Sequence, residues 1–99
     1  MSIEFEWDEK KRRANIYKHG IDFACAEELF EGPMFFEADK KENYGELRFF
    51  GLGLVGDRVI MVSYTNRSEK VIRIISMRIA KSSERKLFLK FLKEMEGKS

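Results

Sequence analysis

The stretch from Arg58 to Arg85, RVIMVSYTNRSEKVIRIISMRIAKSSER, decides the fold of this 99-residue chain. It contains two apolar runs rich in β-branched residues, separated by a polar turn at 66–70, and arginines stand among the apolar residues. Such runs favour strands, and a strand that alternates arginine with isoleucine needs one wet face and one dry face. We therefore predict strands at 59–64 and 71–79 that present guanidinium groups to an anion. Phosphate suits this planar fork of donors.

The segments before this pair predict further helices and strands. Asp8 and Asp22 are typical N-caps, and Gly20 is typical of a helix end. Gly51 and Gly53 suggest a bulge or a close approach of the backbone inside a strand. We therefore expect, in chain order, a short strand or extended segment at 3–7, helices at 9–18 and 23–30, and strands at 34–38 and 47–55.

The C-terminal segment predicts one more helix, which Ser82 or Ser83 caps and which runs to about Glu96, with its apolar residues on one face. Polar turns are expected at 39–45 and at Gly56–Asp57. The order of elements predicts an α+β fold in a single domain, residues 1–99. In this fold an antiparallel β-sheet carries two N-terminal helices and a C-terminal helix, packed on one of its sides.

Composition and charge exclude several classes of protein. The net charge is only +2 although 36% of the residues are charged, so overall charge does not by itself indicate nucleic acid. Cys25 is the only cysteine, which excludes an internal disulfide and a cysteine-based zinc site and favours a reducing, cytoplasmic setting. No stretch has the length of a membrane span, and the N-terminus lacks the apolar segment of a signal peptide.

The arginines of the strand at 71–79 are the first candidates for chemistry. Arg73 and Arg78 lie on opposite faces of an ideal strand, unless a bulge intervenes. Each arginine either contacts phosphate or forms an ion pair with a carboxylate such as Glu46, Asp57 or Glu84.

Two polar groups at strand ends offer further candidates. Tyr64 and Arg67 close one strand, where they either stack a base and hold a phosphate or simply pack and turn the chain. Glu46 and Arg48 share a face at the start of another strand. They serve either as a base beside an anion holder or as an ion pair.

His19 is the only histidine in the chain. It stands at the end of the helix predicted at 9–18, where a histidine interacts well with free carbonyl groups, and it is also a candidate general acid or base. One histidine without a cysteine cluster does not predict a metal site. The glycines of GLGLVGD have the wrong spacing for a nucleotide-binding loop.

Four blocks of the sequence resemble a known family. They are FEWDEKKRRANIYKHGIDFACAEELF, YGELR, DRVIMVSYTNR and RIISMRIAKSSER, in this order, from Phe5 to Arg85. Together they resemble the BrnT family, the toxins of bacterial type II toxin–antitoxin systems. The resemblance implies a fold similar to RelE-type ribonucleases, cleavage of RNA that inhibits translation, and no cofactor. It also implies a BrnA-like antitoxin whose ribbon-helix-helix domain binds operator DNA, so that the toxin meets DNA only through its partner.

The resemblance also suggests roles for particular residues. Cleavage through the 2′-hydroxyl needs no metal, but it needs a base, cations for the developing charge and an acid for the leaving oxygen. We expect catalytic residues among Arg67, Arg78, His19 and Glu46, and RNA-binding residues among Arg48, Arg73, Lys18, Tyr64 and Ser76. Lys18 and His19 match the family's KHG, and Ser76 matches its IIS. The identity of the base stays open among His19, Glu46 and the Lys18 amine. The alternative of a non-catalytic module that binds RNA or an antitoxin also stays open.

Overall fold

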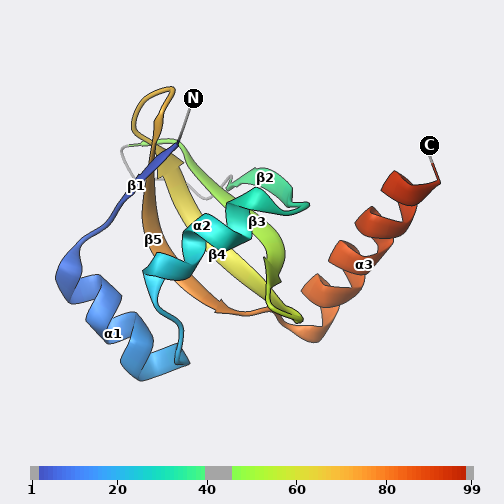
Figure 1. Ribbon diagram of the computed structural model, residues 1–99, viewed down its shortest axis with the longest axis horizontal. Helices are drawn as coiled ribbons and strands as arrows, with labels where there is room; N and C mark the ends of the chain where they lie inside the picture. Colours follow the sequence, from blue (N-terminus) through green and yellow to red (C-terminus); the bar gives the residue numbers. More distant parts are fainter. Residues whose placement is uncertain (1–2, 40–45, 98–99) are drawn as a thin grey trace.

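The computed structural model describes residues 3–39 and 46–97, which form one five-stranded sheet flanked by helices (Figure 1). The strands are β1 (Glu4–Glu6), β2 (Phe35–Asp39), β3 (Arg48–Val55), β4 (Arg58–Asn66) and β5 (Val71–Ile79). The helices are α1 (Glu9–His19), the 3-10 turn η1 (Phe23–Cys25), α2 (Ala26–Glu31) and α3 (Ser82–Glu96). The predicted α+β fold is confirmed. The predicted turn at 39–45 lies outside the described residues, except for Asp39 at the end of β2.

The sheet has the order β1-β5-β4-β3-β2. Strands β2 to β5 form the predicted antiparallel meander. At its edge the N-terminal segment adds β1 in parallel to β5, with Glu4 opposite Val71 and Glu6 opposite Arg73. The sheet is therefore mixed, and the N-terminal segment lies beside a strand that begins only at Val71.

The helices begin and end largely where the sequence predicts. The Asp8 carboxylate accepts hydrogen bonds from the backbone N–H groups of Lys10 and Lys11, and Gly20 ends α1 at φ 70°, where a side chain would be strained. The predicted serine cap of α3 is wrong. Lys81 occupies the N-cap position, and the Glu84 carboxylate accepts a hydrogen bond from the Lys81 backbone N–H at 2.8 Å.

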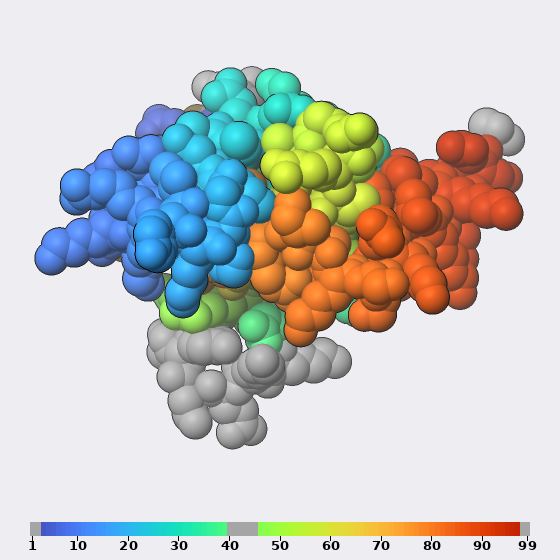
Figure 2. All heavy atoms as spheres, turned by 90° about the horizontal axis from the view of Figure 1, so that it is seen from below, coloured from blue at the N-terminus to red at the C-terminus, as the bar shows by residue number. Residues whose placement is uncertain are grey.

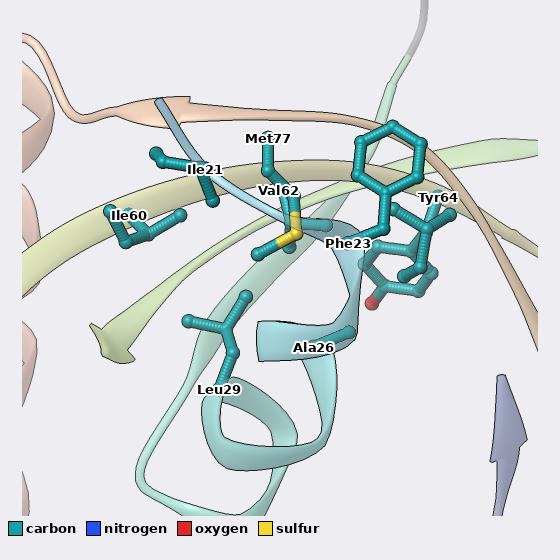
Figure 3. Packing of buried hydrophobic residues seen from close by; sticks show 9 residues of the cluster. Ile21, Phe23, Ala26, Leu29, Ile60, Val62, Tyr64 and Met77 are labelled. Carbon is teal, nitrogen blue, oxygen red and sulfur yellow. The ribbon is translucent and has the colours of Figure 1, made fainter. Parts of the chain in front are cut away.

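The helices cover both sides of the sheet, so the expectation that all of them pack on one side is wrong. Ile60 and Val62 of β4 pack with Leu29 of α2 in the larger core (Figure 3). The alternate residues Val59 and Met61 face the other way and pack with α3 in a smaller core. We call these the helical face and the open face. On the open face α3 packs on β3 and β4, its Phe91 contacts Phe35 of β2, and its C-terminal end extends beyond the sheet (Figure 1, Figure 2).

A bulge in β5 changes which residues share a face. Ser63 pairs with Ser76 but the next residue of β4, Tyr64, pairs with Ile74, so Ile75 is an extra residue in the ladder. This brings Arg73 and Arg78 to the same side, the open face.

At Gly53 the backbone of β3 approaches α2 closely, since a Cβ there would lie 2.8 Å from the Leu29 Cδ1. The close approach predicted for that strand is confirmed.

Asn15 closes the edge of β5 beyond the end of β1. Its side-chain amide donates to the carbonyls of Met77 and Ile21, and its oxygen accepts a hydrogen bond from the Met77 N–H. Because the amide pairs with both backbone groups of Met77, it replaces one residue of a neighbouring strand. Asn15 is buried, and it fixes α1 beside the sheet.

None of the helices in the described segments is long and apolar enough to cross a membrane.

Candidate functional site

A row of polar side chains crosses the open face from strand to strand. Arg73 of β5 lies opposite Thr65 of β4 on one side and Glu6 of β1 on the other. Arg48 of β3 adjoins Phe49, the partner of Tyr64, and so stands beside Thr65 in the same row. We call Arg48, Thr65, Arg73 and Glu6 the arginine row. Neighbouring strands lie about 4.8 Å apart, so the two arginines are about 10 Å from each other at the backbone.

Glu6 joins two arginines at the β1 end of the row. Its Oε2 accepts a hydrogen bond from Arg73 Nη1 at 2.9 Å and lies 3.7 Å from Arg67 Nε. Arg67 follows β4 directly, and its backbone N–H donates to the Val71 carbonyl, which tightens the turn into β5. The side chains of Glu6, Arg67 and Arg73 are 39%, 53% and 34% exposed. The group is therefore both preorganised and open to a ligand.

The next row along the open face is uncharged in its middle strands. Ser76 of β5 lies opposite Ser63 of β4, which lies opposite Phe50 of β3. Phe50 is half-buried, whereas its neighbour Phe49 faces the other way and stacks on Tyr64. Two hydroxyl groups and an aromatic ring therefore stand beside the arginine row. Ser63 and Phe50 were not predicted as site residues, although Ser63 alternates with the buried Val62 and Tyr64 and is therefore expected to face outward.

Arg78 lies further along the same face and is engaged differently. Its two terminal nitrogens donate to the two oxygens of the Glu84 carboxylate, at 2.8 and 2.9 Å. These hydrogen bonds raise the pKa of Arg78 and lower that of Glu84. Arg73 and Arg78 pair with residues of β4 that are four apart, so about 13 Å of strand separates them. The ion pair with Glu84, one of the sequence alternatives, ties β5 to the first turn of α3.

Tyr64 lies in the larger core on the helical face and is not brought to the arginine row. Its ring stacks on Phe49 and packs edge-on against Phe30, with centroid distances of 5.6 and 5.1 Å. Burial raises its pKa to about 12. The structure therefore shows the packing alternative for Tyr64. Its neighbour Thr65 stands in the row, and the Thr65 hydroxyl donates to the Leu47 carbonyl at 2.7 Å.

The candidate bases from the sequence lie in different places. Lys18 and His19 are exposed in the last turn of α1, beside the helix C-terminus that suits a cation. Among the described residues, no hydrogen bond or ion pair joins either of them to Arg73 or Arg78. Glu46 lies near the other end of the row, 3.5 Å from Arg48 Nε. The structure thus brings Arg48, Arg67, Arg73 and Ser76 to one open surface.

This surface is suited to binding a chain of phosphates. Arginine forks hold phosphate oxygens and stabilise negative charge, hydroxyl groups add hydrogen bonds, and an aromatic ring offers a base something to stack on. Within residues 3–39 and 46–97 there is no cluster of three or more His, Cys, Asp or Glu side chains that fits a metal ion. The charged and polar groups that this surface presents are the guanidinium groups, the serine hydroxyls and the carboxylates of Glu6 and Glu46.

Comparisons with known proteins show which family the chain resembles and which solved structure is similar to it. The family model described as the ribonuclease toxin, BrnT, of type II toxin–antitoxin systems matches residues 7–84. The 1.1 Å crystal structure of the Brucella abortus ribonuclease toxin, BrnT, is similar with a TM-score of 0.63 and 29% sequence identity. That match covers 82% of this chain and 100% of the Brucella chain. No curated protein matches.

Proposed function

Because the chain belongs to the BrnT family of ribonuclease toxins of type II toxin–antitoxin systems, we propose that it is an endoribonuclease that cleaves RNA on its open face. The observation that carries the proposal is the arginine row, in which Arg73 and the adjoining Arg67 are held by one carboxylate and are still exposed. Cleavage of cellular RNA in the cytoplasm would inhibit translation.

The reaction that fits this surface is attack by a 2′-hydroxyl on the adjacent phosphate, without a metal ion. The attack adds negative charge to the phosphate oxygens, and Arg73 and Arg67 supply preorganised positive charge at that point. The products of this route are a 2′,3′-cyclic phosphate and a 5′-hydroxyl end.

The surface around the row supports the binding of a single strand. Phe50 is positioned for a base to stack on it, in place of Tyr64, and Ser63 and Ser76 stand between this ring and β1. Arg48 lies about two strands from Arg73 and suits a neighbouring phosphate. Both terminal nitrogens of Arg78 are engaged by Glu84, so a phosphate contact there requires this ion pair to open.

The partner of such a toxin is an antitoxin encoded beside it. We propose that this partner is BrnA-like and carries a ribbon-helix-helix domain, which binds the operator while the toxin is neutralised. A small adjacent reading frame with a ribbon-helix-helix pattern supports this proposal, and its absence beside the gene argues against it.

Purified protein and two labelled RNAs test the proposed activity. One RNA is native, and in the other every 2′-hydroxyl carries a methyl group. We expect the protein to cut the native RNA with and without EDTA, to leave cyclic phosphate ends, and to spare the methylated RNA. Cutting of the methylated RNA contradicts 2′-hydroxyl attack, and loss of cutting in EDTA contradicts the metal-independent route. If neither RNA is cut, but both are bound, the protein is a binding module.

A further inference from the structure

We propose that Glu6 is the general base of the cleavage reaction. This inference rests on the proposed function and names the group that the sequence left open. Glu6 precedes the range matched by the family model, so only the geometry of this chain points to Glu6.

The position of Glu6 on β1 directs its side chain to the site. Phe5 packs into the larger core, so the residues on either side of it, Glu4 and Glu6, point to the open face. The parallel pairing of β1 with β5 places Glu6 directly opposite Arg73. A segment of only three residues therefore brings one carboxylate to the end of the arginine row.

The contacts of Glu6 leave room for a substrate hydroxyl. Both of its contacts with described residues, Arg73 at 2.9 Å and Arg67 at 3.7 Å, use Oε2. Oε1 is therefore the oxygen available to a ligand on this partly exposed side chain. A phosphate held by Arg73 and Arg67 places the neighbouring 2′-hydroxyl next to Glu6, because this hydroxyl is only a few bonds from the phosphorus.

The step balances without a further reactant except water. Glu6 Oε1 takes the proton of the 2′-hydroxyl as the 2′-oxygen forms a bond to phosphorus. The bond from phosphorus to the 5′-oxygen breaks, and its electron pair stays on that oxygen, which takes a proton from water. The hydroxide that remains takes up the proton from Glu6, which restores the carboxylate. Arg73 and Arg67 stabilise the charge on the remaining phosphate oxygens throughout.

Glutamine at position 6 separates a base from a positioning residue. The Gln oxygen still accepts a hydrogen bond from Arg73, but the amide does not take a proton at neutral pH. We expect Glu6→Gln to lower kcat by about 100-fold or more, with KM changed less than about 3-fold. Glu6→Ala should lower kcat to a similar extent and also raise KM, because both arginines lose their anchor.

The control is Glu4→Gln, which changes an exposed carboxylate on the same strand and the same face and should leave kcat unchanged. Binding of a 2′-O-methyl RNA shows that each variant is folded with an intact site. Glu6→Gln that cuts at the native rate overturns the assignment, and so does Glu6→Gln that restores the activity lost in Glu6→Ala. If Glu46→Gln lowers kcat by about 100-fold and Glu6→Gln does not, the base lies at the other end of the row. A native protein that binds RNA and cuts none overturns the proposed function itself.

Discussion

Two arginines of β5, Arg73 and Arg78, lie on the same face of one strand and differ in what holds them. Arg73 meets a single carboxylate oxygen of Glu6 on an open surface. Arg78 is held by both oxygens of Glu84, and Glu84 also accepts a hydrogen bond from the backbone N–H of Lys81 at the start of α3. The first arrangement leaves guanidinium donors for a ligand, and the second uses the terminal nitrogens to join two elements. A residue type alone therefore does not tell a binding arginine from a structural one.

The same contrast extends to the two ends of β5. The end near Arg73 is paired by β1 and carries the candidate site. The end near Arg78 is closed by the Asn15 side chain and packs against α3 through neighbouring residues. We expect changes at the first end to act on RNA and changes at the second end to act on stability.

The largest expected effect on stability comes from Asn15→Ala at the closed end. This substitution leaves the buried N–H and carbonyl of Met77 without partners, which should lower the free energy of unfolding by about 2–4 kcal/mol. Chemical denaturation measures the loss. RNA cleavage at a temperature where the variant is fully folded should be close to native, and a native denaturation midpoint would show that Asn15 does not hold the edge of β5.

A pair of adjacent aromatic residues tests the two faces of β3. Phe50→Ala on the open face should weaken RNA binding by about 1–3 kcal/mol through lost stacking and change stability little. Phe49→Ala on the helical face removes the ring stacked on Tyr64, so it should destabilise the fold and change binding little. For both variants, filter binding measures the affinity for RNA and thermal melting measures the stability. Equal effects of the two substitutions on binding would contradict the assignment of the faces.

The smallest effect concerns the pH dependence of stability at the closed end. The hydrogen bonds from Arg78 lower the pKa of Glu84 in the folded protein, so the folded state binds this proton more weakly than the unfolded chain does. The stabilisation from the pair is therefore complete above the ordinary pKa of glutamate and is lost as the pH falls through the lowered one. Glu84→Gln should lower the free energy of unfolding by about 1 kcal/mol at pH 7 and by less at pH 3. The free energy of unfolding of this variant should therefore change less with pH on the acid side, which chemical denaturation at several pH values measures. A pH-independent cost would contradict this account.

The sequence predicts most of the fold because its signals are local. Runs of apolar residues, β-branched in β4 and β5, predict these strands and β3, and Asp8 and Gly20 bound α1. The larger errors are non-local. The strands carry apolar residues on both sides, so nothing local specifies that α3 packs on the opposite face from α2.

The candidate site was predicted in part, for a similar reason. The arginines of the row are visible in the sequence, but the face they share depends on the bulge at Ile75, which local spacing does not reveal. Glu6 joins Arg73 across 67 positions of sequence. The alternation of Glu4, Phe5 and Glu6 shows that the two glutamates share a face of their strand. It does not show that Arg73 lies opposite Glu6.

We propose above that RNA is cleaved at the Arg73 end of β5. The most direct test measures kcat/KM for RNA cleavage by Arg73→Ala and Arg78→Ala, each at a temperature where melting curves show it folded. We expect Arg73→Ala to lose about 100-fold or more, since it removes charge that faces the phosphate, and Arg78→Ala to stay within about 3-fold of native. A large loss in Arg78→Ala together with near-native cleavage by Arg73→Ala would contradict the account and move the site to the α3 end of the sheet.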